Sequence, residues 1–311
     1  MSSEKQHYAL FAGTSHVELA QEVAECLGLT LGEIDLGRFP DGEVSCSLKE
    51  NVRGRDMFVL QSLGHDPDRF LIELLAIVDA LKRASARLIV AVVPYLCYAR
   101  QDRVDAPCRP ILAKVVADVL QVAGVSAVLT FDLHTGQLEG FFDIPIDNLP
   151  AVPVLAEAYR LRHPQEFVVV APDLGSVKLA RRYASYLGVD LVIIDKKRLG
   201  PERVEVVALI GDVKGKDVLL ADDMCSTGGT LVSAAKACQE KGAKRIDACV
   251  THGLFVGDAL KKIAQSPLET VLVSNTVPLR CEQEKLTVVS VAPALAEAIQ
   301  CILSGRRIAT V

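Results

Sequence analysis

VLLADDMCSTGGTL, residues 218–231, joins a short apolar run to two adjacent carboxylates and then to a string of hydroxyl and glycine residues. The apolar run is typical of a buried strand, and TLVSAAKACQEKG (230–242) is typical of a helix that follows it. Glycine lets backbone N–H groups approach an anion closely, and a helix N-terminus adds donors and the positive end of the helix dipole. The stretch therefore predicts a phosphate-binding turn that has no Walker lysine.

Asp222 and Asp223 would repel a phosphate, so we expect them to contact a different chemical group. Carboxylates accept hydrogen bonds from a cis-diol, and they also attract Mg²⁺. A phosphate, a diol and a metal close together describe a ribose 5-phosphate. A helix N-cap followed by flexible glycines is the alternative interpretation of the same letters.

The rest of the chain alternates short apolar runs with amphipathic helices. The helices include 69–85 and 110–124. The expected strands are 8–13, 57–62, 87–93, 126–132, 167–172, 191–195, 217–222 and 245–250. Nearly continuous apolar strands separated by helices predict an α/β fold, with mainly parallel sheets that helices flank.

The chain also repeats itself. VELAQEVAECLGL (17–29) resembles VKLARRYASYLGV (177–189), VRGRDMFVL (52–60) resembles VKGKDVLL (213–220), and ARLIVAVV (86–93) resembles AKRIDACV (243–250). The three offsets of 160, 161 and 157 residues are nearly equal and fall in the same order. Apolar elements resemble one another by chance, but the shared V-[RK]-G-[RK]-D is more specific, so we predict two tandem copies of one domain.

The composition of the chain argues against several classes of protein. A net charge of −5 argues against nucleic acid as the main partner. The longest apolar run, at 88–99, is too short to cross a membrane and contains Pro94. The first residues lack the pattern of a signal peptide, and nine scattered cysteines without a CxxC pair favour reduced thiols. We therefore expect a cytoplasmic protein.

Other polar residues follow the expected strands, and ligands of open α/β sheets bind beyond the carboxyl ends of strands. His134 and Asp173 each lie just after a strand and could hold Mg²⁺, although histidine rarely binds Mg²⁺ directly. IDKKR (194–198) and YARQDR (98–103) offer cations for phosphates, and RFPDGE (38–43) predicts a turn. Each has a plainer interpretation, as a structural histidine, a solvated turn or a simple hairpin loop.

With these residues in view, the sequence resembles the ribose-phosphate pyrophosphokinase family over nearly its whole length. The shared segments are GRFPDGE (37–43), VRGRD (52–56), ELLAIVDALKRASA (73–86), YARQDR (98–103), DLHTGQLEGFFDIPIDNL (132–149), IIDKKR (193–198), GDVKGKDVLLADDM (211–224), STGGT (226–230), THGLF (251–255), SNTVPL (274–279) and VSVAPALAEAI (289–299). DLHxxQxxGFFDIP is highly specific. The resemblance implies two similar phosphoribosyltransferase-type domains. It also implies Mg²⁺-dependent transfer of the β,γ-diphosphoryl group of ATP to the C1 hydroxyl of ribose 5-phosphate, which releases AMP.

The resemblance also implies a role for each matching residue. Residues 1–148 would form the ATP-side domain and 149–311 the ribose-5-phosphate domain, with the last helix (about 291–304) packing back on the first domain. Lys196 and Arg198 would be catalytic residues on a mobile loop. The implied ATP-binding residues are Phe39, Asp41, Gly42, Glu43, Arg100, Gln101 and Arg103, and the implied metal residues are His134 and Asp173. The implied ribose-5-phosphate residues are Arg198, Asp222, Asp223, Ser226, Thr227, Gly228, Gly229 and Thr230. The loop at 39–43 would come from a neighbouring subunit, so a homo-oligomer, a hexamer or an assembly of dimers, is expected.

Several positions depart from the family's commonest bacterial pattern, including Leu96 and Cys97 before YARQDR and the stretch SLGHDPDRF (62–70). Ser226 replaces an acid and Gly228 an alanine in the phosphate loop, and Val104 replaces a lysine after ARQDR. These departures bear on regulation by phosphate and ADP rather than on the chemistry. Two rival functions stay open at this point, a phosphoribosyltransferase that consumes the product and a non-catalytic regulatory relative.

Overall fold

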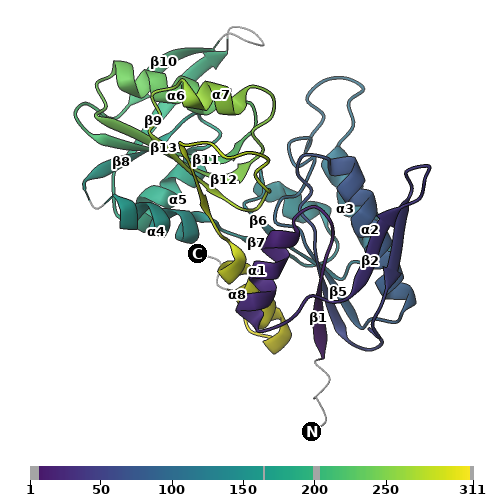
Figure 1. Cartoon of the computed structure of the whole chain (residues 1–311). Helices are drawn as coiled ribbons and strands as arrows, with labels where there is room; N and C mark the ends of the chain where they lie inside the picture. The colour runs from purple at the N-terminus through teal and green to yellow at the C-terminus, as the bar shows by residue number, and fades with distance from the viewer. Residues whose placement is uncertain (1–6, 164, 199–203, 309–311) are drawn as a thin grey trace. The chain divides into compact units, whose positions relative to one another are not determined.

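The computed structural model describes residues 7–163, 165–198 and 204–308, with only the backbone described at 196–198 and 204–207. The chain forms two compact units (Figure 1). Unit 1 comprises residues 1–150, 276–278 and 292–311, and unit 2 comprises residues 151–275 and 279–291.

Unit 1 contains a five-stranded parallel sheet in the order β1-β4-β5-β6-β7. Its strands are β1 (Tyr8–Ala12), β4 (Asp56–Leu60), β5 (Leu88–Val92), β6 (Ala127–Phe131) and β7 (Ile146–Leu149). Its helices are α1 (Val17–Leu27), α2 (Pro67–Arg83), α3 (Leu112–Ala123), the 3₁₀ helix η1 (Gly136–Phe141) and α8 (Ala292–Ser304). Figure 1 shows α1 and α8 on one face of the sheet and α2 and α3 on the other.

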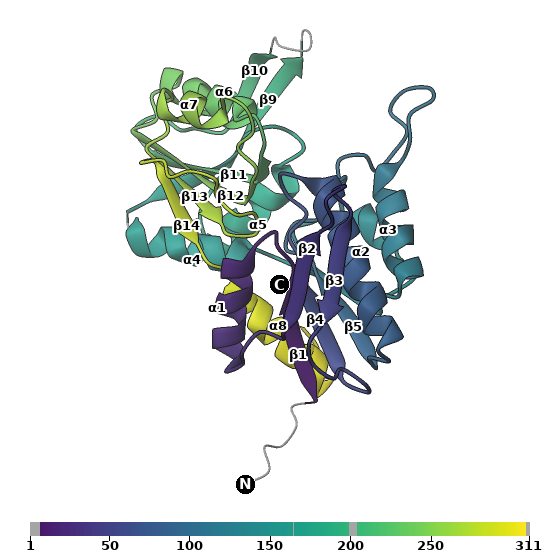
Figure 2. The same cartoon turned by 45° about the vertical axis from the view of Figure 1, so that its right-hand side comes forward.

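A separate antiparallel pair, β2 (Ile34–Arg38) and β3 (Val44–Leu48), extends unit 1 as a hairpin beside α2 (Figure 2). Its turn carries the predicted RFPDGE segment. The Phe39 N–H donates to the Glu43 carbonyl at 2.9 Å, and the Asp41 carboxylate accepts from the Glu43 N–H at 3.1 Å. Gly42 has φ +95°, a conformation that favours glycine, so the PDG signal for a turn is confirmed.

Unit 2 contains a seven-stranded sheet in the order β10-β9-β8-β11-β12-β13-β14, which is parallel except for the β9–β10 pair. Its strands are β8 (Phe167–Ala171), β9 (Leu191–Arg198), β10 (Val204–Ile210), β11 (Asp217–Cys225), β12 (Arg245–Gly253), β13 (Thr270–Ser274) and β14 (Leu286–Val289). Its helices are α4 (Val152–Arg162), α5 (Val177–Leu187), α6 (Gly229–Glu240) and α7 (Ala259–Ala264). Both figures place α4 and α5 on one face and α6 and α7 on the other.

The two units are copies of one topology. The order β1-β4-β5-β6-β7 matches β8-β11-β12-β13-β14 strand for strand, and in each unit an antiparallel pair follows the first helix of the repeat. The V-[RK]-G-[RK]-D segments form the same turn twice. Gly54 and Gly215 have φ of +72° and +71°, and their N–H groups donate at 2.8 Å to the carbonyls of Ser85 and Gly242. The matching strand order and the matching turn hydrogen bonds therefore confirm the predicted duplication.

Each unit has its own core. Apolar residues of β4 and β5 pack against α2 and α3 in unit 1, and those of β8, β11 and β12 pack against α6 in unit 2. No disulfide joins cysteines within the described ranges. Among the helices that the structure describes, none is both long enough and apolar enough to cross a membrane.

All eight expected strands are present, but β9, β11 and β12 are longer than expected, and β12 continues to Gly253. Strand β9 continues to Arg198 because β10 pairs with it, so Lys196 and Arg198 lie in a strand and the expectation of a loop there is wrong. Strand β11 continues to Cys225, so Asp222 and Asp223 lie inside the strand near its end rather than after it. The sequence pattern does not predict the short edge strands β7 and β14, because runs of four partly buried residues carry no clear alternation.

Gly28 and Gly188 end the equivalent helices α1 and α5 in the left-handed conformation, with φ of +66° and +69° and no atom within 4 Å of the position that a Cβ would take. We predict that Gly28→Ala and Gly188→Ala each lower the free energy of unfolding by about 1 kcal/mol, because an L-residue is strained there. Urea unfolding measures the change.

Gly37→Ala is the matched control, since Gly37 is equally uncrowded but lies in strand β2 without a positive φ. It should leave stability unchanged or raise it slightly. Equal destabilisation by all three changes would show that conformational strain is not the cause.

Candidate functional site

The predicted ribose-5-phosphate residues of strand β11 and the loop after it lie where β11 extends beyond the neighbouring strand β8. Pairing with β8 stops at Leu220, whereas pairing with β12 continues to Cys225. Asp222 and Asp223 therefore lie where one side of β11 has no strand beside it. The chain after β8 turns away there and carries Asp173. The fold thus brings three predicted site carboxylates to one edge of the unit 2 sheet.

A serine hydroxyl joins two of these carboxylates. Ser176 Oγ lies 2.8 Å from Asp222 Oδ1 and 3.1 Å from Asp173 Oδ1, and the Ser176 N–H donates to the same Asp173 oxygen at 3.1 Å. Asp222 Oδ1 also accepts from the Asp223 N–H at 3.1 Å. Sequence reasoning missed Ser176, because a serine before a helix reads as an ordinary N-cap.

Burial makes this cluster electrostatically costly. Asp222 is only 7% exposed. Burial raises its pKa well above the ordinary value, the charges of Asp223 and Asp173 raise it further, and the Ser176 hydrogen bond opposes them. Burial also raises the pKa of the adjacent Cys225 thiol to about 12, with Asp222 adding to the effect, so this cysteine is no nucleophile at neutral pH.

The predicted phosphate loop, residues 226–230, follows directly. Gly228 is the N-cap of α6 with φ +74°, and a glycine has no side chain with which to cap the helix. The turn after β12 supports the loop from beneath. The N–H groups of Leu254 and Phe255 donate to the Cys225 carbonyl at 3.0 Å, and that of Val256 donates to the Ser226 carbonyl at 2.9 Å. The helix N-terminus and its dipole are thus arranged as an anion site requires.

The same positions in unit 1 have different chemistry. The offset of 161 residues places Gln61 and Ser62 where unit 2 has Asp222 and Asp223. Ser62 Oγ donates to the Thr276 carbonyl at 2.6 Å, and the side chain of Val277 packs where a Cβ on Gly64 would lie. In unit 1, therefore, neutral side chains replace the acids, and the chain's own residues 276–278 pack against this strand end.

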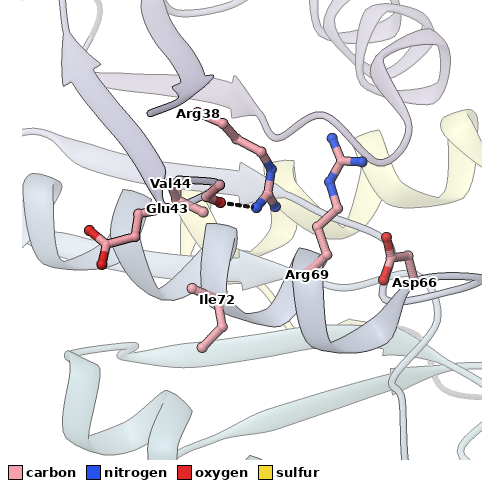
Figure 3. A pocket seen from close by; sticks show the side chains of 7 residues that line it. Arg38, Glu43, Val44, Asp66, Arg69 and Ile72 are labelled. Carbon is pink, nitrogen blue, oxygen red and sulfur yellow. Dashed lines mark hydrogen bonds between the residues drawn. The ribbon is translucent and has the colours of Figure 1, made fainter. Parts of the chain in front are cut away.

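The predicted ATP-binding loop lies on the β2–β3 hairpin of unit 1. A pocket of about 430 Å³ between hairpin and helix is lined by Arg38, Gly42, Glu43, Val44, Asp66, Arg69 and Ile72 (Figure 3). Arg38 donates to the Gly42 carbonyl at 2.5 Å, and the Glu43 carboxylate points away from both guanidinium groups. Phe39 is 53% exposed at the turn, which leaves its ring accessible for contact.

A second unit 1 cluster joins the loop after β5 to the loop after β6. The buried Asp102 accepts from Arg103 at 3.0 Å, from Thr135 at 3.0 Å and from Gln137 at 2.8 Å. Burial raises its pKa, but the hydrogen bonds from Thr135 and Arg103 and the Arg103 charge outweigh burial, so the net pKa is lowered. Asp102 thus holds together the loops that carry Arg100, Gln101 and Arg103 on one side and the exposed His134 on the other.

Other predicted site residues are placed only in part. Lys196 and Arg198 pair with Val206 and Val204 through the backbone of β9 and β10, and their side chains lie outside the described residues. His134 and Asp173 belong to different units. Among the residues that the structure describes, no group of three or more His, Cys, Asp or Glu side chains is arranged to hold a metal ion.

Fold and loop together define an α/β protein of the phosphoribosyltransferase type, duplicated within one chain. Comparison with known proteins gives the family. The model of the N-terminal domain of ribose phosphate pyrophosphokinase matches residues 8–124, and the phosphoribosyl synthetase-associated domain matches residues 198–311. The chain belongs to the ribose-phosphate pyrophosphokinase family.

Individual relatives agree over nearly full length. The ribose-phosphate pyrophosphokinase of Vibrio cholerae is 48% identical over 94% of this chain and 95% of its own. That of Wolinella succinogenes is 47% identical over the same shares. The crystal structure of phosphoribosylpyrophosphate synthetase from Mycobacterium smegmatis superposes with a TM-score of 0.90 at 39% identity, covering 96% of this chain and 99% of the other. The resemblance stated from the motifs is confirmed.

The raised pKa of Asp222 generates a stability prediction. A carboxyl whose pKa is raised by folding stabilises the protein below its unfolded value near 3.8, and this contribution is lost as pH rises through the folded value. Asp222→Asn mimics the protonated form, so in metal-free buffer at about pH 8 it should raise the free energy of unfolding by on the order of 1 kcal/mol.

The gain should shrink as the pH is lowered toward about 5, which urea unfolding at several pH values measures. Asp212→Asn is a control, because Asp212 is an exposed carboxylate of the same unit outside this cluster. A gain that does not depend on pH would contradict the electrostatic cause.

Proposed function

We propose that this enzyme transfers the β,γ-diphosphoryl group of ATP to the C1 hydroxyl of ribose 5-phosphate with Mg²⁺, giving phosphoribosyl pyrophosphate and AMP. The observation that carries the proposal is the unequal duplication. Both units have the same strand order, but only the β11 end combines an acid pair with a glycine-containing helix start. One sugar-phosphate site per chain, with the other unit available for the nucleotide, suits a reaction of one sugar phosphate with one ATP.

In the proposed site, residues 149–311 bind ribose 5-phosphate. Residues 226–230 hold the 5-phosphate at the start of α6, where N–H groups and the dipole favour an anion. Asp222 and Asp223 accept hydrogen bonds from the ribose hydroxyls, which removes the apparent conflict between two acids and a phosphate loop.

Residues 1–148 bind ATP in this proposal. Phe39, Asp41, Gly42 and Glu43 contact the adenine side from a neighbouring copy of the chain, which the exposure of Phe39 supports. Arg100, Gln101 and Arg103 contact the nucleotide on the loop that Asp102 fixes. The protein would then act as a homo-oligomer in the cytoplasm.

The residues fit a magnesium ion through their donor chemistry. Asp173 offers a partly exposed carboxylate, and Mg²⁺ in phosphoryl-transfer sites is usually held by one or two carboxylates together with substrate phosphates. Asp173 would hold the ion, with His134 contributing through water or phosphate. When bound, the ion would neutralise phosphate charge.

The protein's own part in the mechanism is positioning and charge stabilisation. The C1 hydroxyl oxygen attacks the β-phosphorus and gives up its proton to water. The bond from that phosphorus to the α-phosphate oxygen breaks, and AMP leaves with that oxygen. Negative charge grows on bridging and non-bridging oxygens, and Lys196 and Arg198 would stabilise it.

The decisive assay mixes purified protein with ATP, Mg²⁺ and ribose 5-phosphate and measures AMP. We expect AMP release that requires ribose 5-phosphate and matches phosphoribosyl pyrophosphate formed. No ribose-dependent AMP at any of several phosphate concentrations would favour a non-catalytic regulatory relative. Pyrophosphate release from phosphoribosyl pyrophosphate and a base would favour a phosphoribosyltransferase.

Lys196→Ala tests the catalytic assignment. Losing one contact made in the transition state should lower turnover about a hundredfold or more. Ribose 5-phosphate binding, measured by calorimetry, should remain close to that of the unchanged protein, because the phosphate loop and acid pair are intact. Lys197→Ala is the matched control on the same strand. Near-normal turnover in Lys196→Ala would remove this lysine from the mechanism.

A further inference from the structure

Ser176 occupies the N-cap position of α5 but does not cap it. A serine there normally accepts a hydrogen bond from an N–H of the first helical turn, which stabilises the helix. Here the Ser176 side chain makes no capping hydrogen bond to α5, and its hydroxyl points instead to Asp222 and Asp173. The residue is 8% exposed, so water cannot easily replace these hydrogen bonds.

The duplicated unit provides an internal comparison. His16 is the N-cap of the equivalent helix α1, at an offset of 160 residues, and its Nδ1 accepts from the Leu19 N–H at 3.4 Å. In unit 1, where Gln61 replaces the first acid, the N-cap side chain accepts a hydrogen bond from the first turn of the helix. In unit 2, where the acids are present, the N-cap side chain donates a hydrogen bond to Asp222 instead.

The hydrogen bonds around Ser176 show what the hydroxyl adds. Asp173 Oδ1 already accepts from the Ser176 N–H at 3.1 Å, so the Asp173 carboxylate keeps one partner without the hydroxyl. A hydroxyl has a single proton to donate. The shorter separation, 2.8 Å, is to Asp222 Oδ1, which also accepts from the neighbouring Asp223 N–H at 3.1 Å. The hydroxyl therefore matters most for Asp222.

We propose that Ser176 is a positioning residue that orients the Asp222 carboxylate for the sugar hydroxyls, at the expense of capping its own helix. This rests on the proposed function, because it assigns Asp222 to the ribose. With Oδ1 held by the Ser176 hydroxyl and the Asp223 N–H, Asp222 presents its other oxygen at a fixed angle. The nucleotide side of the site lies outside this effect.

Steady-state kinetics of Ser176→Ala and Ser176→Thr test the proposal. In Ser176→Ala the KM for ribose 5-phosphate should rise about tenfold, since a hydrogen bond to a charged group is lost, while the KM for ATP stays unchanged. Ser176→Thr keeps the hydroxyl and should restore the lower KM. Calorimetric titration with ribose 5-phosphate alone should show the same order of affinities.

His16→Ala is the matched control. It removes a side chain that caps a helix, so it should lower thermal stability and leave both KM values unchanged. The proposal is overturned if Ser176→Ala, shown to be folded by circular dichroism, keeps the KM for ribose 5-phosphate within about twofold, because the hydroxyl would then have no bearing on Asp222. It is also overturned if both KM values rise equally, or if Ser176→Thr is as impaired as Ser176→Ala.

The test of the Ser176 role can fail independently of the test of the proposed reaction. If the unchanged protein releases no ribose-dependent AMP, the proposed reaction fails. The calorimetric comparison still decides whether the Ser176 hydroxyl controls sugar-phosphate affinity. If the unchanged protein is active but the two serine variants behave alike, only the positioning role fails.

Discussion

Burial of Asp222 beside two further carboxylates is the constraint on which the rest of the site depends. A lone ionised carboxyl in this position would be strongly destabilising, because few groups replace its lost water. The fold compensates by ending β8 early, so that the Ser176 hydroxyl can reach Asp222 while the Asp223 N–H approaches the same oxygen. A sugar with two adjacent hydroxyls would complete the set of donors, so the electrostatic cost in the unliganded protein favours binding.

Unit 1 shows what the same backbone becomes when that constraint is absent. Gln61, at the position of Asp222, accepts from the Ser15 N–H at 3.1 Å and donates to Glu73 at 2.8 Å. Glu73 in turn accepts from the N–H and hydroxyl of Thr14. In unit 1, the Glu73 carboxylate therefore accepts the hydrogen bonds of the loop after β1. In unit 2, the loop after β8 lies beside the acid pair instead. Unit 1 thus satisfies this strand end with its own side chains, whereas unit 2 keeps an acid pair there for the proposed sugar.

The sequence predicted the fold further than the site. Apolar runs and helix periodicity were enough for the α/β class, because they depend on burial alone. The duplication also needed the more specific V-[RK]-G-[RK]-D turn among the three matching segments. The extension of β9 to Arg198 depends on pairing with β10, which no local pattern reveals. Ser176 was missed, and the structural role of Asp102 was not predicted, for a different reason. Each works through partners distant in sequence, Asp222 for the first and Thr135 for the second, and a serine before a helix or an aspartate between cations reads locally as ordinary.

The backbone contacts of residues 226–230, the predicted phosphate loop, explain why departures from the common pattern are tolerable there. Position 226 is held through its carbonyl, which accepts from the Val256 N–H, so exchanging an acid for serine leaves the backbone of the loop in place. Position 228 has φ +74°, where alanine is strained and glycine is not, and a Cβ there would come no closer than 3.4 Å to the Ala259 carbonyl. Glycine in place of alanine therefore relaxes the turn. The β12–α7 turn fixes the backbone of the loop through its hydrogen bonds. The residue type at position 226 then changes the charge of the loop, and the residue type at position 228 changes its backbone strain.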